Sequence, residues 1–231
     1  MVDAGLLLAF TLAAVFVLMM PGPTVLTVVS YGLRLGPRAA GASTAGVVLG
    51  DGLAVTLCLT GAGAVLAVSP LAFEIIKWCG VAYLLWLAFG IWRTSNAPDA
   101  ALNLDLRTAP GLHPGADATH AAADRAAQTD LAKVFRQTFM VTTLNPKGIA
   151  FFLAFIPQFV AADRPYWGQV TVYGLLFVGL GGLNALAYAY LSGRLAFVFD
   201  RPGPVRILRR VSAGFLLFAA LITAAGHVPT L

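Results

Sequence analysis

Six long runs of apolar residues divide this sequence, and each is long enough to cross a lipid bilayer as a helix of about 20 residues. Their approximate ranges are Leu6–Tyr31, Ala39–Val68, Leu71–Trp92, Val134–Val160, Val170–Leu191 and Val205–Ala225. None alternates between apolar and polar residues as barrel strands do, so the runs predict helices. Only 11% of the residues are charged, against roughly 25% in soluble domains. We therefore expect an all-α membrane protein surrounded by the lipid bilayer.

The lysines and arginines are unevenly distributed between the two sides of the predicted spans. The first, third and fifth gaps hold twelve of them, whereas only Lys77 and Arg164 lie on the opposite side. Because cytoplasmic loops collect Lys and Arg, this distribution predicts that both termini face away from the cytoplasm. It also accounts for the net charge of +5, and no nucleic-acid-binding motif is present, so we expect no nucleic-acid partner.

One segment, Ser95–Asp130, differs in composition from the rest. It is rich in Ala, Asp and Thr and has almost no large apolar residues, which predicts a flexible cytoplasmic linker. The linker separates residues 1–94 from residues 131–231, and each part contains three runs. An odd number of spans gives the two halves opposite orientations, as in transporters with inverted repeats. The predicted architecture is six transmembrane helices arranged as two inverted three-helix repeats.

Two of the apolar runs contain sequences that break helices. These are Pro21-Gly22-Pro23 in the first run and Asn145-Pro146-Lys147 in the fourth. Proline lacks a backbone N–H group and clashes with the preceding turn. We therefore predict that helices 1 and 4 are broken. Freed carbonyl groups at such breaks can bind an ammonium group, and freed N–H groups can bind a carboxylate.

Asp51 and Asn184 add polar groups to the second and fifth runs. At 1.5 Å per residue, both residues and both breaks lie about 14–20 Å from the nearest predicted cytoplasmic arginine, near the middle of a hydrocarbon core about 30 Å thick. We expect them to form one site. Asp51 either binds a substrate ammonium, carries a coupling proton or is a structural partner of Lys147. Lys147 either attracts a carboxylate or neutralises Asp51, and Asn184 is either a ligand or a polar contact between helices.

A stripe of small residues, spaced by four, runs along the second predicted helix. It consists of Ala42, Gly46, Gly50 and Ala54. Small residues at this spacing allow another helix to approach closely. We therefore expect a tight helix contact beside Asp51.

Several stretches resemble the signature sequences of the LysE/RhtB family of amino-acid exporters. They are Met20–Leu26, Gly32–Gly36, Ala45–Asp51, Gly80–Gly90, Asn145–Phe152 and Ile156–Phe159. The resemblance implies proton-driven export of an amino acid or related metabolite across the inner membrane of a bacterium, where the Lys and Arg distribution places both termini in the periplasm. It assigns the site to Pro21, Gly22, Pro23, Gly50, Asp51, Asn145, Pro146 and Lys147. We add Thr24 to this site; the family often has Asn at its position, and this difference leaves the substrate open. Whether the protein forms a homodimer is also left open.

Two other functions are compatible with single features of the sequence. A metal or inorganic-ion exporter of the same superfamily would need clustered Cys, His or carboxylate ligands, yet Asp51 stands nearly alone in the membrane. A membrane thiol oxidoreductase would use Cys58 and Cys79, and only Lys77 lies near them in sequence as a basic neighbour. We expect a transporter rather than an enzyme, with no cofactor and no bound metal.

Overall fold

The computed structural model describes residues 3–20, 22–94, 131–161, 164–199 and 202–225, which contain helices and no strand. The helices are α1 (Ala4–Met19), α2 (Pro23–Leu35), α3 (Arg38–Val68), α4 (Pro70–Thr94), α7 (Leu131–Thr143), α8 (Pro146–Ala150), the π-helix η1 (Phe151–Phe155), the 3₁₀-helix η2 (Ile156–Phe159), α9 (Tyr166–Phe199) and α10 (Pro202–Ala225). Pro21 and the predicted linker, Ser95–Asp130, lie outside the described residues.

Four helical segments are long and apolar enough to cross a membrane. They are Arg38–Val65, Glu74–Arg93, Leu131–Phe159 and Tyr166–Ser192. The helices α1 and α2 meet at an angle of 57° and add a fifth span if the bent pair counts as one. These spans confirm the prediction of an all-α membrane protein. The helix α10 occupies the sixth predicted run, but six spans and an inverted repeat stay predictions, since at most five spans are found within the described residues.

The two helix breaks have the same local construction. At the first, Gly22 is extended, with φ −145° and ψ −177°, and Pro23 is the first residue of α2. At the second, Asn145 caps α8 and Pro146 is its first residue. A proline fits this position because the first helical N–H group has no partner within the helix. Each of these two prolines therefore begins a new helix after an interruption.

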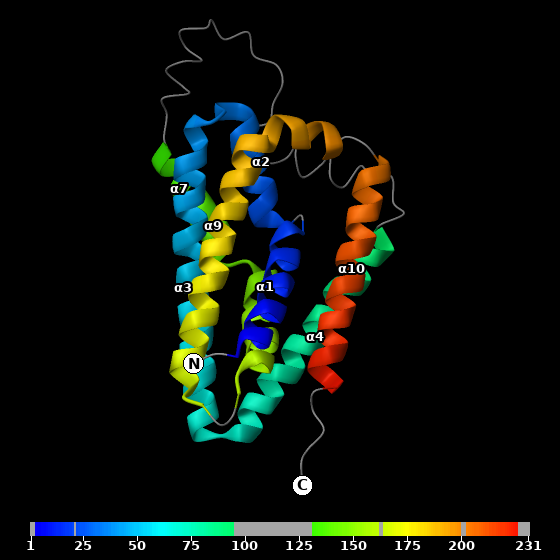
Figure 1. Ribbon diagram of the computed structural model, residues 1–231. Coiled ribbons are helices and arrows are strands. Elements are labelled where there is room, and N and C mark those ends of the chain that lie inside the picture. Colours follow the sequence, from blue (N-terminus) through cyan, green and yellow to red (C-terminus); the bar gives the residue numbers. More distant parts are fainter. Residues whose placement is uncertain (1–2, 21, 95–130, 162–163, 200–201, 226–231) are drawn as a thin grey trace, which may run out of the picture.

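Packing brings elements of the two halves together around α1 (Figure 1). The helices α2 and α3 both contact α7 and α9. The helices α4 and α10 lie side by side on the other side of α1 (Figure 1). The largest core cluster lies where α1, α3, α9 and the π-helix η1 meet. Neither half forms a separate bundle, so residues distant in sequence can contribute to one site.

Glycines of the predicted small-residue stripe allow α3 and α7 to pack closely. A Cβ atom at Gly46 would lie 2.7 Å from the carbonyl oxygen of Phe135, and one at Gly50 would lie 2.9 Å from that of Phe139. Both distances are shorter than any normal contact with a Cβ atom. The close approach of two helix backbones therefore requires glycine at these positions, and it lies directly beside Asp51 in sequence.

We predict that Gly50→Ala destabilises the folded protein, because the added methyl group meets the α7 backbone, which cannot move as a side chain does. Overpacking of this kind costs about 1–3 kcal/mol, or a fall of several degrees in the unfolding temperature. Gly41→Ala in the same helix is the matched control, since a Cβ atom there meets nothing within 4 Å. Thermal unfolding in detergent measures both variants, and equal unfolding temperatures would contradict the proposed contact.

Candidate functional site

The carbonyl groups at the end of α1 accept hydrogen bonds from three side chains of the second half of the chain. The last carbonyls of any helix lack partners within the helix, and inside a membrane no water replaces them. The contacts are Lys147 Nζ to the oxygens of Val17 (3.0 Å) and Met20 (3.1 Å), Asn184 Nδ2 to Leu18 (3.0 Å) and Tyr188 Oη to Met19 (2.8 Å). Four consecutive carbonyls are thus satisfied by α8 and α9.

A second set of hydrogen bonds joins the two helix breaks to each other. Asn145 Nδ2 donates to Thr24 Oγ1 at 3.1 Å, and Thr142 Oγ1 lies 3.3 Å from the same oxygen. The Asn145 side-chain oxygen in turn accepts the backbone N–H of Lys147 at 3.1 Å. Thr24 therefore makes a polar contact across the interface between the halves, directly beside the first break.

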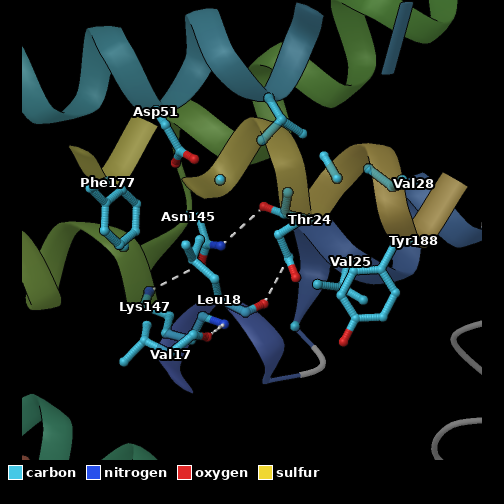
Figure 2. A pocket seen from close by; sticks show the side chains of 16 residues that line it. Val17, Leu18, Thr24, Val25, Val28, Asp51, Asn145, Lys147, Phe177 and Tyr188 are labelled. Atoms are coloured by element: carbon cyan, nitrogen blue, oxygen red, sulfur yellow. Dashed lines mark hydrogen bonds between the residues drawn. The ribbon is translucent and has the colours of Figure 1, made fainter. Parts of the chain in front are cut away.

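Asp51 is buried, and its carboxylate makes no hydrogen bond to any described residue. The residue is 7% exposed, and its charge interacts with that of Lys147 without a direct ion pair between them in the described part of the chain. Figure 2 shows the Asp51 side chain pointing from α3 toward Asn145, with no hydrogen bond drawn to its oxygens. A buried carboxylate without a donor is costly, and ionisable groups at this depth usually serve function.

Glycine on α9 provides the space for this carboxylate. A Cβ atom at Gly181 would lie 2.7 Å from Asp51 Oδ2, so any larger residue would displace the side chain. Gly181 lies three residues before Asn184, which places both on one face of α9. The face of α9 that caps α1 thus also accommodates Asp51.

These residues surround a cavity of about 40 Å³. Six of the residues predicted to form the site line it, namely Gly22, Thr24, Asp51, Asn145, Lys147 and Asn184. A water molecule needs roughly 10–15 Å³, so the cavity has room for water, but it is far smaller than the roughly 300–1,000 Å³ of pockets that bind small molecules.

Different kinds of side chain pack on two sides of the cavity. Toward the connection between η2 and α9 lie packed aromatic rings: Phe10, Phe151, Phe152, Phe155, Phe159, Tyr173 and Phe177. Phe177 belongs both to this cluster and to the cavity wall. Toward the turn between α2 and α3 lie Val28, Ala40, Val47, Ala185 and Ala189, with Tyr188 packed against them.

Two of the residues predicted to form the site, Pro23 and Pro146, do not line the cavity, and a third lies outside the described residues. Pro23 is exposed at the start of α2, and Pro146 lines an apolar groove against α4 that also contains Cys79. Pro21 lies outside the described residues. The two prolines we can place shape the breaks through the backbone rather than by facing the cavity.

Sequence reasoning missed Tyr188, Phe177 and Gly181, all of which line the cavity. Tyr188 lies four residues after Asn184, so the helical period would have placed it on the same face. No local signal distinguishes Gly181 from the other glycines of this helix. The two cysteines are free and lie in different surroundings, Cys58 against the aromatic core and Cys79 at the apolar groove.

The fold and the site define a membrane transport protein, in which broken helices and buried charged groups meet between two halves. The family model for the LysE type translocator matches residues 15–226. The chain belongs to this translocator family, which confirms the resemblance noted in its signature sequences.

Relatives of similar length match almost the whole chain. The homoserine/homoserine lactone efflux protein of Salmonella typhimurium is 30% identical over 95% of this chain and 96% of its own length. That of Salmonella typhi is 29% identical with the same coverage. An uncharacterized membrane protein of Vibrio cholerae is 28% identical over 96% of this chain and 98% of its own. No solved structure matches the chain.

We predict that Gly181→Ala reduces transport, because the added methyl group must displace the Asp51 carboxylate. A hydrogen bond to a charged group contributes about 1.5–3 kcal/mol, so a misplaced carboxylate is expected to weaken solute binding about tenfold or more. Gly179→Ala in the same helix is the control, since a Cβ atom there meets nothing within 4 Å. Efflux from cells producing equal amounts of each variant is the measurement. Parental efflux by Gly181→Ala would show that the position of Asp51 is not critical.

Proposed function

We propose that this translocator exports a small amino acid of the homoserine type in exchange for protons. The observation that carries the proposal is the Asp51 carboxylate, which is buried at the cavity and has no hydrogen-bond donor among the described residues. A substrate ammonium group supplies the missing donors. Asp51 is therefore assigned the amino group of the substrate.

The start of α2 suits the other end of a zwitterion. Gly22, Thr24 and Val25 all line the cavity, and no side chain caps the first turn of α2. The first N–H groups of a helix lack partners and lie at the positive end of its dipole. They are therefore suited to hold a carboxylate. The corresponding turn of α8 is less available, because the backbone N–H group of Lys147 already donates to the Asn145 side chain.

Lys147 is not needed as the carboxylate ligand in this arrangement. Its ammonium group already binds two carbonyls at the end of α1. It still places a positive charge near Asp51. Together the two charges cancel, so a neutral zwitterion leaves the net charge of the site unchanged.

Competition for one carboxylate provides a simple basis for exchange. Asp51 can hold either a substrate ammonium or a proton, but not both. Substrate binds the ionised form on the cytoplasmic side, and a proton displaces it on the opposite side, where the acidic compartment lies. The site then opens again to the cytoplasm, where the protonated Asp51 carboxyl releases its proton. Since a cavity of about 40 Å³ cannot hold the solute, each step requires one end of the site to open.

The names of the relatives agree with this assignment of the amino group. Two of them are described as efflux proteins for homoserine and homoserine lactone. These two compounds share an amino group, but only homoserine has a free carboxylate. A site that depends on the amino group, with the carboxylate as a secondary contact, accommodates both.

We also propose that the α2–α3 turn and the start of α7 face the cytoplasm. Both lie at one end of the molecule, opposite the α3–α4 turn (Figure 1). Arg34, Arg38, Lys133 and Arg136 lie on these elements. We expect a reporter that is active only in the periplasm to be active when it is fused at Leu231. Activity of a cytoplasm-specific reporter at the same position would reverse the proposed orientation.

Transport by the purified protein tests the proposed substrate and coupling. We expect homoserine and homoserine lactone to exchange across proteoliposomes, and 4-hydroxybutyrate, which lacks the amino group, not to exchange. In inverted vesicles with an acidic lumen, the parent is expected to accumulate homoserine. Asp51→Asn keeps the shape of the side chain but cannot exchange a proton, so accumulation driven by the pH gradient is expected to disappear.

The outcomes of these measurements are distinct. Accumulation by Asp51→Asn at the parental rate would make Asp51 structural. Equal exchange of 4-hydroxybutyrate and homoserine would refute the role of the amino group. Gly179→Ala, which leaves the site untouched, controls for protein amount and insertion.

A further inference from the structure

The end of α1 has the chemistry of a cation site. Two carbonyl oxygens, those of Val17 and Met20, converge on a single atom, Lys147 Nζ, at 3.0 and 3.1 Å. They lie at the negative end of the α1 dipole. The Asp51 carboxyl group lies near enough for its charge to interact with that of Lys147. Carbonyls of a broken helix, together with a carboxylate, are the groups with which secondary transporters bind small monovalent cations.

The geometry points to Lys147 as a tethered cation that permanently occupies this site. We infer that its ammonium group takes the place of a free monovalent cation, so the protein requires no sodium or other dissolved cation. This goes beyond the proposed function, because it assigns a bound cation and not the substrate. The prediction that transport itself is independent of sodium rests on the proposed function.

The glycine of the first break lies directly beside the ammonium group. A Cβ atom at Gly22 would lie 3.4 Å from Lys147 Nζ, in van der Waals contact with it. Asn184 and Tyr188 satisfy the neighbouring carbonyls of Leu18 and Met19 with neutral donors. A positive charge is therefore placed only where two oxygens converge near Asp51.

A simpler reading is that Lys147 only caps a helix end. In that case any donor of suitable reach would replace it, and its charge would be irrelevant. If the site selects a cation, only a charged group restores it. The two readings differ in what a neutral replacement does.

Chemical rescue separates these readings. Lys147→Ala removes three carbons and the ammonium group, which together equal propylammonium. We expect this variant to be less stable than the parent, and propylammonium to raise its unfolding temperature by about 2–4 °C at roughly four times its dissociation constant. The parent, whose site is filled, should show no shift. Lys147→Met, which fills the space without charge, should show none either.

Neutral probes provide the remaining controls. Propanol, which has the same carbon chain without charge, should not stabilise Lys147→Ala, whereas sodium or ammonium ions are expected to do so weakly. Lys147→Gln tests the simple capping role, because its amide donates without charge. Parental stability in Lys147→Gln would overturn the inference, and so would a shift with propanol equal to that with propylammonium.

Failure of this inference can be told apart from failure of the proposed function. The unfolding measurements contain no substrate, so they remain valid whatever the protein exports. If Lys147→Ala cannot be purified alone, it is prepared in propylammonium and the amine is then removed by dialysis. Stability unchanged by that removal would also overturn the inference. Homoserine exchange by the parent in choline instead of sodium should proceed at an unchanged rate, and a sodium requirement would refute the tethered-cation role.

Discussion

The free carbonyl groups at the end of α1 impose the constraint on which the rest of the structure depends. A helix that stops inside a membrane leaves several acceptors without partners, and lipid cannot satisfy them. In this protein the donors are Lys147, Asn184 and Tyr188. All three belong to the second half of the chain, so the first half cannot complete its own broken helix. The two halves must pack together for either break to be tolerated.

This arrangement separates groups that hold the structure from groups that remain available. The carbonyls of α1 are satisfied, and Thr24 and Asn145 are bonded to each other. The Asp51 carboxylate has no such donor among the described residues, although it lies between these satisfied groups. A rigid frame around one unsatisfied acceptor is what selective binding requires, because only a solute that supplies the missing donor offsets the cost of burial.

The packing on either side of the site is unequal. Aromatic rings fill the end near the connection between η2 and α9, where the chain also departs from α-helical geometry in η1 and η2. On the other side the buried residues are Val28, Ala40, Val47, Ala185 and Ala189, with Tyr188 packed against them. Irregular helix turns often mark places where transport proteins and enzymes change shape. The aromatic end therefore combines the largest contacts with the least regular backbone.

The sequence by itself determined the features that depend on composition and on single residues. The lengths of the apolar runs predicted helix positions, because lipid requires continuous apolar helices. The predicted run Ala39–Val68, for example, corresponds to α3, Arg38–Val68. The two breaks followed from proline, whose missing N–H group acts locally.

Only the tertiary structure decided which residues contact one another at the site. Lys147 binds carbonyls of Val17 and Met20 rather than pairing directly with Asp51, and Pro146 faces away from the cavity. The two Lys147 contacts join residues more than one hundred positions apart, and the geometry of both features depends on how the helices pack, which no local pattern specifies.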